Sequence, residues 1–128
     1  MNDKSILTTI KKLLGLTEEY TAFDTDIIVH INTVLTNLIQ MGVGPVNGFM
    51  IEDSTKKWSD FVPSDKLLFV QQLISYVYIK VRLLFDPPAN TNLIDSLKAN
   101  ALELEFRLYS EHLKEVIASE TVVEPIEE

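Results

Sequence analysis

The chain ends a long apolar run abruptly at two consecutive prolines. From Leu67 to Phe85 most positions are apolar, and the run stops at Asp86, Pro87 and Pro88. A proline disfavours the α conformation of the residue before it, and it lacks the N–H group that would continue a helix. The sequence therefore predicts a helix over residues 64–85 and a rigid corner after it. Because this helix is apolar nearly all round, we expect it to be buried by the other elements.

Three more helices follow from apolar residues that repeat at helical spacing. They are expected at about residues 3–14, 24–41 and 92–118, which predicts an all-α, four-helix bundle-like domain over residues 1–118. The expected start signals are Asp3 for the first helix, Asp24 or Thr25 for the second, Pro63-Ser64-Asp65 for the third, and Thr91 or Asn92 for the fourth. Residues 119–128, with four acids and a proline, are expected to form a flexible acidic tail.

The fourth helix carries more apolar residues than one contact needs. One set follows the 3-4 spacing of a helix–helix seam: Ile94, Leu97, Ala101, Leu104 and Leu108. A second set falls partly off that seam: Leu93, Leu102, Phe106, Leu113, Val116 and Ile117. We expect the first set to pack against the apolar helix.

A long irregular loop, residues 42–63, joins the second and third helices. A structureless segment of this length is unusual in so small a domain and is usually functional or disordered. We expect one short strand at 49–51 and a helical turn within 54–61. The loop is too apolar to be simply disordered, because it holds Phe49, Met50, Ile51, Trp58 and Phe61. It either folds over its own bundle or packs on a neighbouring chain, and the pattern leaves both open.

The charge is acidic and unevenly distributed. The formal net charge is -8, and residues 103–128 hold eight acids against Arg107 and Lys114. Tight nucleic-acid binding depends mainly on neutralising phosphates, so this balance argues against it. The richest apolar stretch, Leu67 to Ile79, holds Gln71, Gln72 and Ser75 and lies between Lys66 and Lys80, so we expect it to be too short and too polar to span a bilayer. The N-terminus lacks the pattern of a signal peptide.

Residue types that carry catalysis do not form a recognisable site. The glycines at 42–48 follow a helix and lack the Lys-Ser/Thr ending of a phosphate-binding loop. Asp26 and His30 are one helical turn apart, but two ligands do not make a metal site. The chain has no cysteine. The remaining candidates are interpreted as surface groups or helix-end charges: His112, Glu18-Glu19, Glu103 with Glu105, and Lys11-Lys12. We therefore expect no enzyme, no cofactor and no metal.

The order and spacing of these segments resemble a known family. The segments are "ILTTIKKLLGL", "YTAFDTDIIVHINTVLTNLIQMGVGP", "GFMI" with "WSDF", and "YIKVRLLFDPP" leading into a last helix. Together they resemble the head-tail connector (adaptor, or head completion) proteins of tailed bacteriophages and prophages of Gram-positive-type hosts. The resemblance covers about residues 3–110.

The resemblance implies a structural virion protein, assembled in the host cytoplasm, that docks on the portal at the head-tail interface. About twelve copies would form a ring that extends the DNA channel, lets DNA pass without specific binding, and receives a stopper or tail-completion protein. It also implies that the loop at 42–62 contacts neighbouring subunits or the next ring, and that the last helix and tail reach the portal. On that basis the expected interface anchors are Phe49, Met50, Ile51, Trp58 and Phe61.

Two other interpretations were weighed. A small helical interaction module, regulatory or assembly-related and without catalysis, explains the bundle and tail equally well. It does not explain a loop that is both long and apolar. A small helical enzyme could use Asp26, His30, a nearby acid and a metal, which metal analysis of the purified protein would test.

Overall fold

The computed structural model describes residues 4–62 and 66–123, and within these ranges it contains helices and no strand. The helices are α1 (Ile6–Leu13), α2 (Asp24–Gln40), α3 (Trp58–Phe61), α4 (Leu67–Phe85) and α5 (Thr91–Val123). The prediction of an all-α protein is confirmed. The predicted turn within the loop is the short helix α3, whereas residues 49–51 form no strand.

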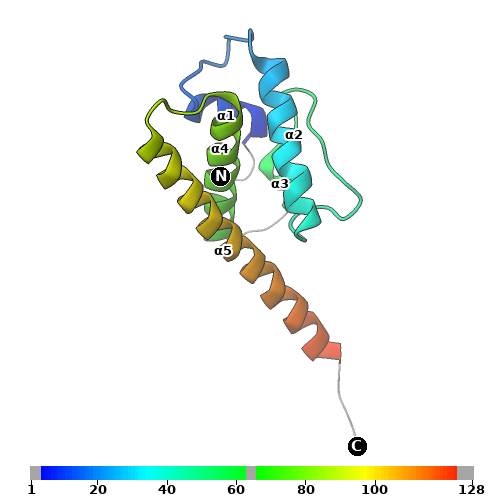
Figure 1. The fold of residues 1–128 in the computed structure, drawn as a ribbon. Coiled ribbons are helices and arrows are strands. Elements are labelled where there is room, and N and C mark those ends of the chain that lie inside the picture. Colours follow the sequence, from blue (N-terminus) through cyan, green and yellow to red (C-terminus); the bar gives the residue numbers. More distant parts are fainter. Residues whose placement is uncertain (1–3, 63–65, 124–128) are drawn as a thin grey trace, which may run out of the picture.

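The helix α4 lies in the centre of the bundle and packs against α1, α2 and α5. Figure 1 shows α2 on one side of α4 and α5 crossing it on another, with α1 across one end. After the corner at 86–88, α5 folds back along α4, and its C-terminal half then projects past the rest of the molecule (Figure 1). The core between these elements is built from aliphatic residues together with Trp58, Phe61 and Tyr76.

The burial of α4 is more one-sided than its composition predicts. Its buried residues are Val70, Leu73, Tyr76, Val77, Ile79 and Val81. Leu67 and Leu68 at its N-terminal end are exposed, and so is Leu84 near its other end. The expectation of burial on several sides is therefore only partly right, because three helices cannot cover the whole circumference of a fourth.

Length and composition alone would let α4 cross a membrane, which corrects the sequence-based expectation. Within the described ranges it is the one helix that passes this test, with 19 residues and a mean hydropathy of 1.4. The core helix of a globular protein passes the same test. The contacts of α4 with α1, α2 and α5 are those of such a core helix.

Two helices begin at caps other than those expected. At α1 the Ser5 hydroxyl accepts a hydrogen bond from the Thr8 amide at 3.2 Å, and the expected cap Asp3 lies outside the described residues. At α5 the Asn90 side chain accepts from the Leu93 amide at 3.2 Å, one residue before the expected caps. Each observed side chain satisfies an amide that the first turn leaves without an intrahelical partner.

The start of α2 is held by an ion pair instead of a side-chain cap. Its N-cap residue is Phe23, and no side chain caps the first turn. Asp24, which was expected to cap, lies 2.9 Å from the Lys11 ammonium group on α1. The same ammonium group donates to the Glu18 carbonyl at 3.0 Å and is almost fully buried. The buried Lys11 side chain therefore links α1 to the start of α2. The sequence-based interpretation of Lys11-Lys12 as helix-end charges did not include this role.

The corner lies where the prolines place it. The helix α4 ends at Phe85, Asp86 has a non-helical backbone with φ of -149° and ψ of 69°, and α5 begins at Thr91. At its other end α5 continues to Val123, so residues 119–123, expected in the flexible tail, belong to the helix. The remainder of the expected tail, 124–128, and the start signal at 63–65 lie outside the described residues.

Candidate functional site

An exposed apolar stripe runs along the outside of α5. We define the outer stripe as Leu102, Phe106, Tyr109, Leu113 and Val116, all of which are exposed. Leu102 is 66% and Phe106 is 70% exposed. Successive residues of an α-helix are about 100° apart, so these five side chains fall within an arc of about 80°. An exposed stripe of this kind marks an interaction surface.

The outer stripe is separate from the face that α5 uses inside its own subunit. The predicted seam faces the core, with Ala101 and Leu108 buried and Leu97 and Leu104 packed against the core cluster. By helical geometry the centre of this seam lies about 120° around α5 from the outer stripe. The helix therefore has two apolar faces, of which the subunit buries one.

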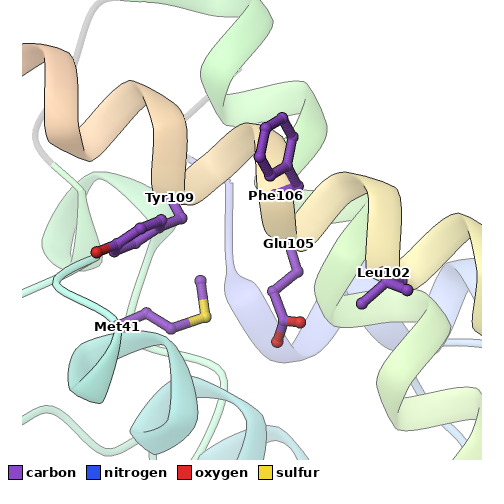
Figure 2. Close-up of a pocket in the computed structure, with 5 residues that line it drawn as sticks. All are labelled: Met41, Leu102, Glu105, Phe106 and Tyr109. Carbon is purple, nitrogen blue, oxygen red and sulfur yellow. The ribbon is translucent and has the colours of Figure 1, made fainter.

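A groove of about 580 Å³ opens beside the outer stripe, where the C-terminal end of α2 meets α5. Met41 from α2 and Leu102, Glu105, Phe106 and Tyr109 from α5 line it. Figure 2 shows the Met41 side chain lying between those of Tyr109 and Glu105, while Phe106 projects from the other side of α5. A concave apolar surface with one carboxylate suits an apolar side chain from another protein segment.

The groove is held in shape by a hydrogen bond across the bundle. The Tyr76 hydroxyl on α4 donates to the Glu105 carboxylate at 3.1 Å. Burial, followed by the charge of Glu105 and this hydrogen bond, raises the pKa of Tyr76 well above its ordinary value. The phenol therefore stays protonated and keeps Glu105 in place.

Further contacts fix α5 up to the point where it leaves the body. The Lys66 ammonium group lies 3.2 Å from Glu111 and 3.4 Å from Glu115. The His112 ring packs on Gly42, where an added Cβ would lie 2.7 Å from the ring Cδ2 atom. Gly42 also has a φ of +101°, which L side chains rarely adopt. His112, interpreted from the sequence as a surface group, is thus a packing residue.

The predicted interface anchors in the long loop do not lie together on the surface. Ile51, Trp58 and Phe61 are buried in the core of their own subunit, and Phe49 is partly buried against Phe61. Met50 alone among the five is well exposed, at 62%. Of the two possibilities left open, the loop adopts the first, because it folds over its own bundle. In this conformation the three buried side chains cannot touch a neighbouring chain.

Hydrogen bonds explain how the loop is attached. The Trp58 indole N–H donates to the Thr9 hydroxyl at 3.2 Å. An isolated bridge joins Ser5 to Lys57, with the Ile6 amide donating to the Lys56 carbonyl at 3.0 Å. The N-terminus of α1 thus pairs with the segment before α3, although the two are far apart in sequence.

Residues weighed for chemistry serve other contacts or lie apart. Asp26 and His30 line a separate pocket with Phe85 and Asp86. In the part of the chain that the structure describes, no group of three His, Asp or Glu side chains is placed to hold a metal ion. Glu103 pairs with Arg107, with oxygen and nitrogen 2.6 Å apart as the i, i+4 spacing predicts, whereas Glu105 binds Tyr76.

These features define an all-α protein in which one helix leaves an apolar face exposed. Residues 6–115, most of the chain, match the sequence model of the phage connector protein family. The chain belongs to this family, and it is a structural component of the virion that meets other phage head or tail proteins. No curated protein and no solved structure matches the chain.

From the sequence, most residues of the outer stripe are predicted only as apolar positions off the seam, and Tyr109 is not among them. The available signal was a second 3-4 spacing, 102-106-109-113-116, which repeats the pattern of the first. Met41 and the groove could not be inferred, because they depend on where the end of α2 meets α5.

Proposed function

We propose that the chain docks on the portal of the phage head, forms a ring there, and extends the DNA channel toward a stopper or tail protein. Membership of the connector family supports a place between head and tail. The single observation that carries the proposal further is the outer stripe of α5, an apolar face that the subunit leaves exposed on a projecting helix (Figure 1).

In this proposal α5 meets the portal. The projecting half of the helix presents Leu113 and Val116 away from the body, and Leu102 and Phe106 continue the same face beside the groove. Apolar side chains at helical spacing are the usual anchors when a helix packs against another protein. The contact of a single subunit can be weak, because a ring of subunits on a ring of portal chains adds avidity.

The tip of the long loop is proposed to meet the next subunit of the ring. Val46 is 89% exposed and Met50 is exposed beside it in the chain, whereas the rest of the loop is anchored through Ile51 and Trp58. Identical subunits close a ring through two different surfaces that fit one another. A fixed loop with an apolar tip supplies one such surface. The net charge of -8 suits a channel through which DNA passes without binding.

Co-purification with the portal tests the docking step. The chain and the portal protein of the same phage are mixed, and the portal ring is isolated by size. We expect the wild-type chain to be retained, and Phe106→Glu on the outer stripe to reduce retention at least tenfold. Val29→Glu is the matched control, because Val29 is an exposed apolar residue on α2. No retention of the wild-type chain, or equal loss in both variants, contradicts the proposal.

Native mass spectrometry of the portal complex tests the ring. We expect about twelve bound copies, the number that the family resemblance implies, arranged with closed rotational symmetry. Met50→Glu should lower the number bound, because it places a charge in the proposed contact between neighbours. A single bound copy, or full occupancy by the Met50 variant, contradicts the proposed ring contact.

A further inference from the structure

Four of the five residues of the outer stripe, from Leu102 to Leu113, form a pattern that is complementary to itself when it is read in the opposite direction. Placing two copies of the stripe antiparallel sets Leu102 of one helix against Leu113 of the second. The same alignment sets Phe106 against Tyr109, and two-fold symmetry repeats both pairs. Each layer thus joins two residues of similar size, aliphatic with aliphatic and aromatic with aromatic. Such self-complementarity is the mark of an isologous contact.

We propose that the chain, before it joins the virion, forms a dimer in which the outer stripes of two copies pack as an antiparallel helix pair. The occupant of the stripe in this state is a second copy of the same chain. This goes beyond the proposed function, since it concerns the protein before it meets the portal, and it does not depend on portal docking being correct.

The groove gives the antiparallel direction an advantage over the parallel one. In the antiparallel pair the projecting end of each α5 lies beside the body of the other copy. Leu113 of the second copy then lies against Leu102, next to the groove that Met41 closes from α2. A parallel pair would place the two projecting ends against each other and would set neither of them beside a groove. The antiparallel pair is therefore the one that brings apolar side chains of a second copy next to both grooves.

Two polar side chains on one flank of the stripe fit the same register. Glu105 and His112 lie on the same flank of the outer stripe, so the alignment brings Glu105 of each copy near His112 of the other. A shift by one heptad toward the N-terminus would instead set Asp95 opposite Leu113 and bury a carboxylate against an aliphatic side chain. The register that pairs Leu102 with Leu113 is thus favoured by the apolar pairs along the stripe and by the polar pair of Glu105 and His112 beside it.

The size of the contact predicts a reversible dimer. The stripe from Leu102 to Val116 is about 21 Å long at 1.5 Å per residue. Its exposed side chains offer roughly 600 Å² per copy, which is at the lower end of the range for specific interfaces. The two copies can then separate when a larger or multivalent partner competes for the stripe. The dimer would keep this apolar face covered until that partner is met.

Disulfide trapping tests the register directly, because the chain contains no cysteine of its own. The double variant Leu102→Cys/Leu113→Cys is oxidised mildly and run on a non-reducing gel, with each single variant as a matched control. We expect the double variant to form a covalent dimer at least fivefold more efficiently than either single variant. Equal trapping in a single variant indicates a parallel or different pairing and overturns the proposal, as does no trapping in any variant.

Native mass spectrometry of the portal-free protein provides the second test. We expect monomer and dimer in proportions that change with concentration, and Phe106→Glu to shift them to monomer with an unchanged circular dichroism spectrum. Val29→Glu should remain dimeric. A monomer at every concentration up to the highest, or a ring without portal, overturns the dimer. Neither result affects the portal co-purification, so the two proposals fail separately.

Discussion

Asn32 links α2 to the long loop through two hydrogen bonds, in which its side-chain amide is once the donor and once the acceptor. The Asn32 Nδ2 group donates to the Ile51 carbonyl at 3.0 Å, and the Ile51 amide donates to Asn32 Oδ1 at 2.8 Å. Ile51 is buried, so its backbone groups need partners within the protein. One polar side chain thereby replaces the strand pairing that the sequence suggested for residues 49–51.

Asn32→Ala should lower the free energy of unfolding by about 2–3 kcal/mol, because it leaves the buried Ile51 amide and carbonyl without partners. Urea denaturation followed by circular dichroism measures the change. Asn37→Ala is the control, since Asn37 is exposed on the same helix. Apart from the change in helix propensity, Asn37→Ala should lower the free energy of unfolding by no more than about 0.5 kcal/mol. Similar losses in both variants would show that Ile51 is held by other contacts.

Tyr76 should make stability depend on alkaline pH. Because its pKa in the folded protein is raised, its contribution is complete below the unfolded pKa of about 10 and is lost as pH rises above that value. We expect the wild-type protein to lose more stability between pH 9 and pH 11 than Tyr76→Phe does. Tyr20→Phe, at an exposed tyrosine, should behave like the wild type. The same pH slope in all three proteins would contradict this role.

Among the elements, α3 and the segment before it form part of the subunit core. Trp58 is fully buried and bonded to Thr9, and Phe61 packs beside Gly44. Gly44 has a φ of +108°, and an added Cβ would lie 2.6 Å from the Phe61 ring. The aromatic residues of the loop therefore stabilise the monomer, and exposed positions such as Met50 are left for contacts with other chains.

Trp58→Ala should destabilise the monomer by about 3–5 kcal/mol, because it opens a large cavity in the core. Thermal unfolding measures the loss. Trp58→Phe is the milder comparison, since it keeps most of the buried volume while it loses the hydrogen bond to Thr9 and part of the packing. An unchanged melting temperature in Trp58→Ala, together with weaker binding to the portal, would return Trp58 to the interface role expected from the sequence.

At the scale of the whole molecule, the body and the projecting end of α5 differ in what holds them. The last deeply buried residue of α5 is Leu108, and Lys66 contacts Glu111 and Glu115 just beyond it. The described side chains from 113 to 118 are all exposed. The deeply buried part of α5 therefore ends at Leu108, and the side chains described beyond residue 112 are exposed.

A chain that ends at residue 118 should unfold at nearly the same temperature as the full chain, because it keeps the seam and both partners of Lys66. A chain that ends at residue 107 should be strongly destabilised, since it loses Leu108 from the core together with Glu111 and Glu115. Calorimetry of the three proteins measures both effects. A large drop for the longer truncated chain would show that the C-terminal end of α5 stabilises the body.

The elements could be predicted because their signals are local. The apolar period predicts α2 and the seam of α5, and the two prolines place the end of α4, since each depends on residues within a few turns of one another. The helix starts were predicted less well. Ser5, Asn90 and Asp24 are all residue types that cap helices. Only the folded chain decides that Ser5 and Asn90 cap a helix, whereas Asp24 forms an ion pair with Lys11.

The sequence by itself determined that this protein is all-α, that a proline corner turns α4 into α5, and that α5 has more apolar residues than one seam requires. The order and spacing of its segments also showed a resemblance to the connector family. Only the tertiary structure decided where the apolar residues of the loop and of the second face of α5 lie. The loop aromatics are in the core, and the outer stripe is on the surface. The physical reason is that periodicity shows how many apolar faces an element has, whereas packing between distant segments decides which of them is covered.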